Sequence, residues 1–277
     1  MTTAAVPANP ARIRAVPAAA KRPGLPGTLR SELTKIASVR STYWTLLAQV
    51  VASIAWAVLN CAGIVSHGAS SDFNAAEASL TGQVALGELI IVVLGALVIT
   101  SEYSTGMIRT SLAVMPRRGV LYAAKAIVFA AVTLTISLVT SFVAFFVGQA
   151  ILSSKHYNTT LGQPGVLRAV LLSAAIVAVF GLLAYGAGAI IRHSAGAITA
   201  ILGVIFLIPA LAQALPNSWF ADVVRWLPGG QALNPIASSA PPVSDHLFSA
   251  WGEFAVFSGY AAVLLAIGAW LFVRRDA

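Results

Sequence analysis

Residues 87–132 read GELIIVVLGALVITSEYSTGMIRTSLAVMPRRGVLYAAKAIVFAAV, in which a short polar stretch separates two long apolar runs. An apolar run of about 20 residues is long enough to cross the hydrocarbon core of a bilayer as an α-helix. The polar stretch, residues 101–119, holds four charged side chains and ends on Met-Pro-Arg-Arg-Gly. The pattern predicts two membrane-spanning helices joined by a short loop, and the role of that loop depends on the side of the membrane on which it lies.

The composition of the whole chain also favours a membrane protein. Of the 277 residues, 58% are hydrophobic and only 9% are charged, whereas soluble domains carry about 25% charged residues. A soluble protein with so few charges would lack the polar surface needed to cover itself. The net charge of +8 could indicate nucleic-acid binding, but basic segments of membrane proteins more often mark the cytoplasmic side and contact anionic lipid. We therefore expect a lipid bilayer, and no nucleic acid, as a partner.

The apolar runs predict an all-α, polytopic membrane protein. Six segments are long enough to span a bilayer, at about residues 43–65, 82–100, 120–152, 168–191, 195–215 and 253–273. The third would reach ~50 Å against a hydrocarbon core of ~30 Å, so we expect it to tilt or to project from the bilayer. Before the last segment, WFADVVRWLPGG at 219–230 predicts a short interfacial or re-entrant helix, because Trp prefers the headgroup level.

Charge placement predicts the orientation in the membrane. Six spans put both termini on one side, and 14 of the 17 Lys and Arg residues fall on that side. Because Lys and Arg are enriched in cytoplasmic loops, we expect both termini and residues 101–119 to face the cytoplasm. Residues 1–27 contain five prolines and no compact apolar segment, which predicts a disordered basic arm rather than a signal peptide. Residues 28–277 then form the membrane domain.

Residues 28–42, TLRSELTKIASVRST, predict an amphipathic helix that leads into the first span. Leu29, Leu33 and Ile36 recur at helical spacing on one face,. Thr28 is a suitable N-cap, and Glu32 lies in the first turn. Such a helix is expected to lie along the inner membrane interface.

The sequence carries no recognisable catalytic or metal-binding motif. It contains no GxxxxGK[ST] phosphate-binding loop, no HExxH pair and no Cys/His cluster with metal spacing,. The single cysteine, Cys61, lies in an apolar run, where a small buried residue is the simpler interpretation. We therefore expect neither an enzyme nor a metal site.

One carboxylate, Glu88, falls well inside a predicted span. An ionisable residue at that depth is a candidate for a transport or proton site, and a proton-coupled secondary transporter that uses Glu88 is the alternative function. The simpler interpretation is a neutral or hydrogen-bonded carboxyl group near the outer end of the second span, partnered by Asn60 or Gln83. A proton-coupled carrier usually needs more than one such group, which counts against that class.

Small residues cluster in the fourth and fifth spans. Ala184/Gly188 and Gly196/Ala200 are small-xxx-small pairs, which allow helices to approach closely. The pairs could serve an interface between subunits or packing within the chain.

The loop of the opening stretch has two interpretations. Gly106 breaks or bends the chain, and the segment from Met107 to Met115 could form one or two helical turns that expose Met107, Ile108, Leu112 and Met115 to a partner,. In that case the loop is a short lever on which a cytoplasmic protein could push. Alternatively, it is a basic loop that only sets the topology. The residue pattern alone does not separate the two.

Three segments carry a family resemblance: LRSELTKIASVRSTYWTLL before the first span, LVITSEYSTGMIRTSLAVMPRRGVLYAAKA around the first inner loop, and the terminal WLFVRRDA. Their order and spacing resemble the permease subunits of ABC-2-type ATP-binding-cassette exporters, most of all the actinobacterial members. The resemblance implies six spans, a second permease subunit as a homo- or heterodimer partner, and two cytoplasmic ATPase subunits. ATP and Mg would then be bound by the ATPases, and this chain would bind no cofactor.

The resemblance also assigns roles to two segments, both of which contact the ATPase in that family. The interface helix is implied to include Leu29, Glu32, Leu33, Lys35, Ile36 and Arg40. The first inner loop is implied to carry the coupling residues Glu102, Tyr103, Gly106, Met107, Arg109, Leu112, Arg117 and Arg118. On this basis the lever interpretation of the loop is preferred.

Overall fold

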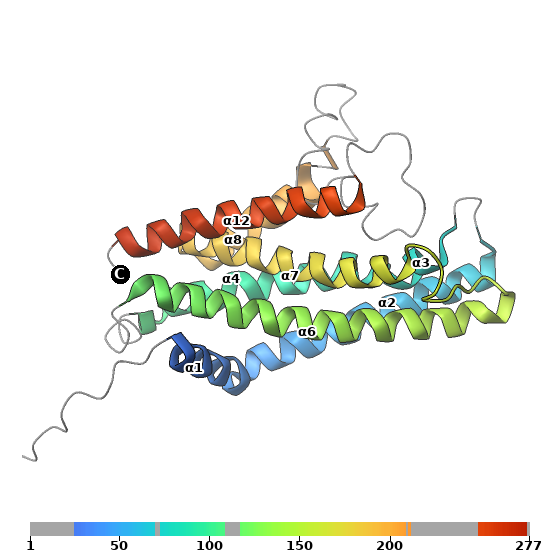
Figure 1. The fold of residues 1–277 in the computed structure, drawn as a ribbon, viewed down its shortest axis with the longest axis horizontal. Helices are drawn as coiled ribbons and strands as arrows, with labels where there is room; N and C mark the ends of the chain where they lie inside the picture. Colours follow the sequence, from blue (N-terminus) through green and yellow to red (C-terminus); the bar gives the residue numbers. More distant parts are fainter. Residues whose placement is uncertain (1–24, 70–72, 109–116, 209, 212–248, 276–277) are drawn as a thin grey trace, which may run out of the picture.

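The computed structural model describes residues 25–69, 73–108, 117–208, 210–211 and 249–275, which are almost entirely helical (Figure 1). The α-helices are α1 (Leu25–Ser38), α2 (Arg40–His67), α3 (Ala75–Gly82), α4 (Glu88–Ser104), α6 (Arg118–Leu152), α7 (Val166–Ile191), α8 (Ser194–Leu202) and α12 (Ala250–Arg274). Short π-helical turns follow α3 and α8, at Gln83–Gly87 and Gly203–Leu207, and a 3-10 turn, Ser153–Lys155, extends α6. The described part of the chain contains no strand, and the predicted all-α fold is confirmed.

Five helices in these ranges are long and apolar enough to cross a membrane, which fits a multi-pass membrane protein. They are α2, the continuous helix Ala75–Ser104 that α3, a π turn and α4 form together, α6 with its 3-10 turn, α7 and α12. They correspond to five of the six predicted spans. At the remaining predicted span, 195–215, the structure has a shorter apolar helix, Ser194–Leu207. Residues 1–24 of the predicted arm and the predicted re-entrant segment at 219–230 lie outside the described residues. The last three residues of the predicted arm, 25–27, are instead the first residues of α1, so the arm was predicted to be too long.

The second span begins earlier than predicted, because the helix covers Ala75–Ser104 rather than 82–100. Asn74 caps its start, since the Asn74 Oδ1 atom accepts hydrogen bonds from two first-turn amides at 3.1 and 3.2 Å. Asn is among the preferred N-cap residues, and the small residues of the first turn are compatible with a helix. As a result Glu88 lies near the middle of a 30-residue helix and not near its outer end.

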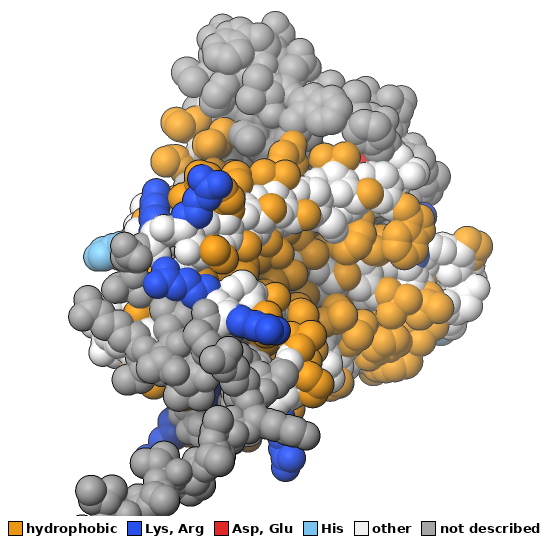
Figure 2. Space-filling model, turned by 60° about the vertical axis from the view of Figure 1, so that its left-hand side comes forward, with side chains coloured by type: hydrophobic (Ala, Val, Ile, Leu, Met, Phe, Trp, Pro, Cys, Tyr) orange, Lys and Arg blue, Asp and Glu red, His pale blue; other side chains and the backbone are white. Residues whose placement is uncertain are grey.

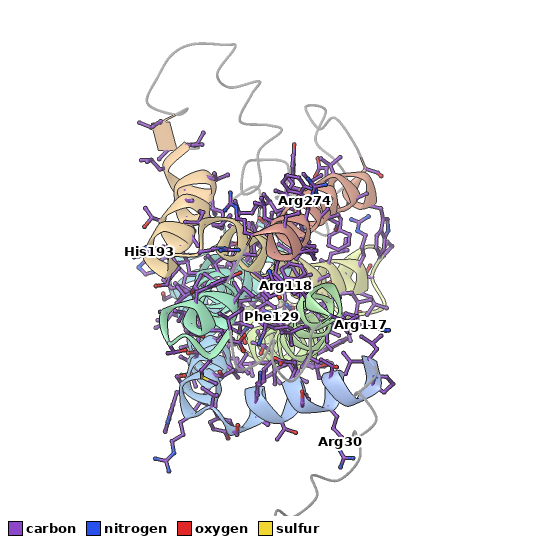
Figure 3. The ribbon with its side chains drawn as sticks, turned by 90° about the vertical axis from the view of Figure 1, so that its left-hand side faces the viewer. Arg30, Arg117, Arg118, Phe129, His193 and Arg274 are labelled. Atoms are coloured by element: carbon purple, nitrogen blue, oxygen red, sulfur yellow. The ribbon has the colours of Figure 1, made fainter. Side chains whose placement is uncertain are left out.

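Helix α1 lies across one end of the bundle rather than along it. In Figure 3 the α1 ribbon runs across the view, whereas the long helices are seen nearly end-on. The helix begins at Leu25, so Thr28 lies inside it, and the prediction of Thr28 as N-cap is wrong. Pro26 occupies the first turn, where a missing backbone N–H breaks no intrahelical hydrogen bond.

Helix α7 is the centre of the bundle and packs against α4, α6 and α12. Of its most apolar stretch, 67% is buried, against 22% for α2 and α12. The approach of α4 to α7 depends on glycine, because a Cβ atom at Gly95 would collide with the carbonyl oxygen of Gly181. A Cβ atom at Gly188 would likewise lie 2.7 Å from Ile99 Cγ2 on α4. The predicted Ala184/Gly188 pair therefore serves packing within the chain.

Candidate functional site

Four charged side chains meet at the end of the bundle that α1 crosses. Glu32 and Lys35 belong to α1, Glu102 to the last turn of α4, and Lys125 to the second turn of α6. The Lys125 Nζ atom lies 2.7 Å from Glu32 Oε2 and 2.8 Å from Glu102 Oε1. The Lys35 Nζ atom lies 2.9 Å from Glu32 Oε1 and 3.4 Å from Glu102 Oε1. We call these four residues the charge cluster.

Most of the charge cluster is removed from solvent. Glu32, Lys125 and Glu102 are 1%, 4% and 6% exposed, while the side chain of Lys35 is 39% exposed. A buried charge costs several kcal/mol in desolvation unless an opposite charge and hydrogen bonds compensate it. Each lysine here lies between the same two carboxylates, so the cluster is neutral and its members depend on one another.

The charge cluster explains which face of α1 packs against the bundle. The buried residues of α1 are Thr28 and Glu32, whereas Leu33, on the predicted apolar face, is 51% exposed. Lys125 lies on the side of α6 that α1 covers, and a buried ammonium group requires a carboxylate within reach. An exposed leucine is not costly beside lipid, which is as apolar as the side chain. The contact of α1 with the bundle is therefore polar.

Burial and the ion pairs oppose each other in setting the pKa values on α1. Burial by itself raises the pKa of Glu32, but the neighbouring ammonium groups of Lys125 and Lys35 outweigh it, so the pKa lies below the usual 4.5. Burial lowers the pKa of Lys35, but Glu32 and Glu102 outweigh that effect and hold it above the usual 10.5. Both α1 groups are therefore stabilised in their charged forms.

The lowered pKa of Glu32 predicts a loss of stability in acid. A carboxyl group whose folded-state pKa is depressed contributes fully above its unfolded-state value, here about 4.5, and its contribution is lost as the pH falls through the folded-state pKa. Because Lys35, Lys125 and Glu102 surround it, we expect Glu32→Gln to lower the melting temperature at neutral pH. The difference from the wild type should shrink below about pH 4. Melting curves of the detergent-purified chain test this, and a difference that does not change with pH would contradict it.

The predicted coupling loop is only partly described, because Arg109 and Leu112 lie outside the described residues. Gly106 adopts a positive φ of 69°, a conformation that favours glycine. Met107 is exposed, but Ile108 is buried against Ile99, Leu121, Tyr122 and Phe272. The expectation that Ile108 is exposed to a partner is thus wrong, because the turn at Gly106 directs it back beneath the spans.

Basic residues gather at the same end of the bundle. Figure 2 turns this end forward and shows Lys and Arg side chains around it, with apolar side chains along the flank. The Arg118 Nη1 atom donates to the carbonyl oxygen of Arg275 at 2.8 Å, and the Arg275 Nη1 atom donates to that of Ile190 at 3.2 Å. The Arg192 guanidinium lies 4.9 Å from the ring centroid of Tyr103. These contacts connect the ends of α4, α6, α7 and α12.

Five of the predicted coupling and interface residues fall into two groups. Glu32, Lys35 and Glu102 join in the charge cluster, while Tyr103 and Arg118 join the contacts around the arginines. Arg117 and Arg40 are exposed. Arg40 was predicted to lie in the interface helix, but that helix ends at Ser38 and Arg40 is the first residue of α2. Lys125 is not among the predicted site residues, because its charge enters only the prediction of topology. Its position seven residues inside α6 is the signal that identifies it, since a lysine that deep in an apolar helix needs a partner.

Polar groups inside the spans pair differently from the prediction. Asn60 donates to the Ala78 carbonyl oxygen at 3.0 Å and to Thr81 Oγ1 at 3.1 Å. Gln83 accepts from Gln49 at 3.1 Å. Neither amide bonds to Glu88, so the expected partners are wrong.

Glu88 is buried and follows a π-helical turn, a feature often found at functional sites. Within the described ranges no three His, Cys, Asp or Glu residues are placed to hold a metal ion.

The sequence matches no protein-family model and no curated protein.

Proposed function

We propose that the chain is the membrane-spanning permease subunit of an ATP-driven exporter of the ABC-2 type in the bacterial plasma membrane. Three segments resemble that family in order and spacing, and the sequence lacks a phosphate-binding loop of its own, so the ATPase would be a separate cytoplasmic chain. The observation that carries the proposal is the charge cluster. It joins the crosswise helix α1 to α4 and α6, the two spans that flank the loop at 105–117.

This arrangement supports a mechanical role for α1 and the loop. Two ATPases that close on ATP would push on both elements from the cytoplasm. Because Lys125 binds carboxylates of α1 and α4 at once, displacement of either element would move the first turns of α6 as well. The spans would then rock as a unit and open the pathway between two permease subunits alternately to each side.

The proposal includes the remaining topology. Both termini would face the cytoplasm, and the apolar helix Ser194–Leu207 would begin a sixth span. In the described residues the end that carries the charge cluster also carries Arg117, Arg118, Arg192, Arg274 and Arg275, which supports placing that end inside.

The proposal is tested by asking whether an ATPase co-purifies with the chain, and whether substitutions in the loop prevent this. The tagged chain, extracted from its native membrane in mild detergent, should retain a soluble ATPase with a phosphate-binding loop, identified by mass spectrometry. Met107→Asp together with Arg117→Glu changes two exposed loop residues and should reduce ATPase recovery at least tenfold, because charge reversal at an interface costs several kcal/mol. Lys155→Glu at the opposite end is the control. Glu102→Ala is a poorer probe, since it also leaves Lys125 short of a partner.

Two results would count against the proposal. If the wild-type chain retains no such ATPase, the permease assignment fails. If the loop variant retains as much ATPase as the Lys155 control, residues 105–117 are only a topology signal.

A proton-coupled carrier remains the second candidate, on the strength of Glu88. Its carboxyl group is buried near the middle of a span, and within the described residues no side chain donates a hydrogen bond to it. Transport by the purified chain alone in liposomes, driven by a pH gradient without ATP, would favour that function.

A further inference from the structure

A cluster of uncharged polar side chains lies in the middle of the bundle. Gln49 and Ser53 belong to α2, Gln83 begins the π-helical turn of the second span, and Ser137 belongs to α6. All four residues are 0% exposed. Ser53 and Ser137 lie close to the midpoints of the spans Arg40–His67 and Arg118–Lys155, which places the four residues near the bilayer midplane. We call them the midplane cluster.

Hydrogen bonds and close contacts hold the midplane cluster together. Gln49 Nε2 donates to Gln83 Oε1 at 3.1 Å, and Gln83 Nε2 donates to the carbonyl oxygen of Ser137 at 3.2 Å. Ser53 faces the same place, because a Cβ atom added to Gly87 would lie 2.9 Å from Ser53 Oγ. That Cβ atom would also lie 3.4 Å from both Gln49 Nε2 and Gln83 Oε1. The cluster thus joins α2, the second span and α6 at one point.

Three buried oxygen atoms of the midplane cluster have no hydrogen-bond partner in the described structure, namely Gln49 Oε1, Ser53 Oγ and Ser137 Oγ. An unpaired buried polar atom is costly, and a bound ion or water molecule is a common reason for one in a native protein. Gln83 Oε1 and the Ser137 carbonyl oxygen each accept one hydrogen bond and keep a second lone pair. The cluster therefore offers up to five oxygen atoms to a ligand.

A monovalent cation fits this set of atoms best. Gln49 Oε1 can only accept, so its ligand must donate a hydrogen bond or carry a positive charge. A water molecule donates at most two hydrogen bonds, whereas a cation attracts every oxygen atom around it. Divalent cations favour carboxylate ligands, and the midplane cluster contains none. Neutral oxygen atoms replace the hydration shell of monovalent cations in membrane channels.

Helix α2 is the element that can admit an ion to the buried cluster. Only 22% of its most apolar stretch is buried, and large apolar side chains such as Trp44, Val51 and Leu59 are exposed. The residues that α2 does bury are small or polar, namely Thr42, Gln49, Ser53, Ala57 and Cys61. A small displacement of α2 therefore costs little apolar packing and opens the midplane cluster.

We propose that the midplane cluster binds one Na+ ion. Gln49 Oε1, Ser53 Oγ and Ser137 Oγ contact the ion from α2 and α6, and Gln83 orients its two neighbours. Ion sites of membrane transporters lie near the midplane where a spanning helix is interrupted, and the π-helical turn Gln83–Gly87 interrupts the second span here. The ion would fasten α2 to the bundle whatever the protein transports, so this inference does not depend on the proposed function.

The first test measures Na+ binding to the unmodified full-length chain. The detergent-purified protein is incubated with radioactive Na+, and the bound isotope is counted by scintillation proximity. We expect about one ion per chain, displaced by unlabelled NaCl but not by choline chloride. NaCl should also raise the melting temperature by a few degrees over choline chloride at equal ionic strength, because a ligand at ten times its dissociation constant raises the folded-to-unfolded ratio about tenfold. Absence of bound Na+ would overturn the proposal and leave a bridging water molecule as the partner of these oxygen atoms.

Variants then locate the ion. Ser53→Ala combined with Ser137→Ala removes two ligand atoms without adding volume, and we expect it to weaken Na+ binding at least tenfold and to abolish the Na+-dependent rise in melting temperature. Ser141→Ala is the matched control, because Ser141 Oγ is also buried, lies one helical turn from Ser137 and is already paired with Ser173 Oγ at 3.1 Å. The control should bind Na+ like the wild type. If the double variant does so too, the ion lies elsewhere and the assignment is wrong.

Discussion

Lys125→Met is expected to lower the free energy of unfolding by about 3–5 kcal/mol, the range found when one partner of a buried ion pair is removed. Methionine matches the length of the lysine stem, so little packing is lost. The cost arises because Glu32 and Glu102 stay buried without the ammonium group that lies 2.7 and 2.8 Å from them. Thermal unfolding of the detergent-purified chain, followed by tryptophan fluorescence, should show a melting temperature lowered by several degrees.

A charge-balanced variant separates electrostatics from packing. Glu32→Gln and Glu102→Gln combined with Lys125→Met remove the buried charges together, and replacement of a whole buried network is often nearly neutral. We therefore expect this triple variant to recover most of the lost stability. Lys155→Met, on an exposed residue, should melt like the wild type. A triple variant as unstable as Lys125→Met alone would show that the lysine stem, and not its charge, matters.

Gly95→Ala is expected to cost about 1–3 kcal/mol, the usual cost of inserting a methyl group into a full core. The three atoms nearest to the added Cβ would all be backbone, namely the carbonyl oxygen, carbonyl carbon and Cα of Gly181, the last at 3.1 Å. Backbone cannot rotate aside as a side chain can, so α4 and α7 would have to separate. Because α7 is the central helix, the effect should appear both as a lower melting temperature and as aggregation during size-exclusion chromatography.

Gly63→Ala is the matched control, since Gly63 also lies within a spanning helix but has no atom within 4 Å of an added Cβ. Alanine has the higher helix propensity by up to about 1 kcal/mol, so this variant should be as stable as the wild type or slightly more stable. Equal melting temperatures for Gly95→Ala, Gly63→Ala and the wild type would contradict the packing described for α4 and α7.

The fold class and most of the helices follow from the sequence alone. Runs of about 20 apolar residues in a chain with few charges have no stable arrangement in water, and in lipid an isolated segment must satisfy its backbone by forming a helix. Both constraints are local, so the predicted bounds of α2, α4, α6, α7 and α12 agree with the structure within a few residues at most helix ends. The prediction is wrong at Ala75, because the first turns of the second span are only weakly apolar and capping by Asn74 sets the start of the helix.

The pairing of the buried charges, in contrast, depends on how the helices pack in three dimensions. Lys125 meets Glu102 from 23 positions away and Glu32 from 93 positions away, and no periodicity along the chain encodes such a meeting. The same holds for the polar face that α1 turns to the bundle, for the burial of Ile108 and for the glycine contact between α4 and α7. In each case the energy comes from two segments meeting in space: a charge needs its counter-charge, and a backbone can approach only where the facing residue has no side chain. Composition and spacing establish that such groups exist, but the arrangement of the helices selects which of them meet.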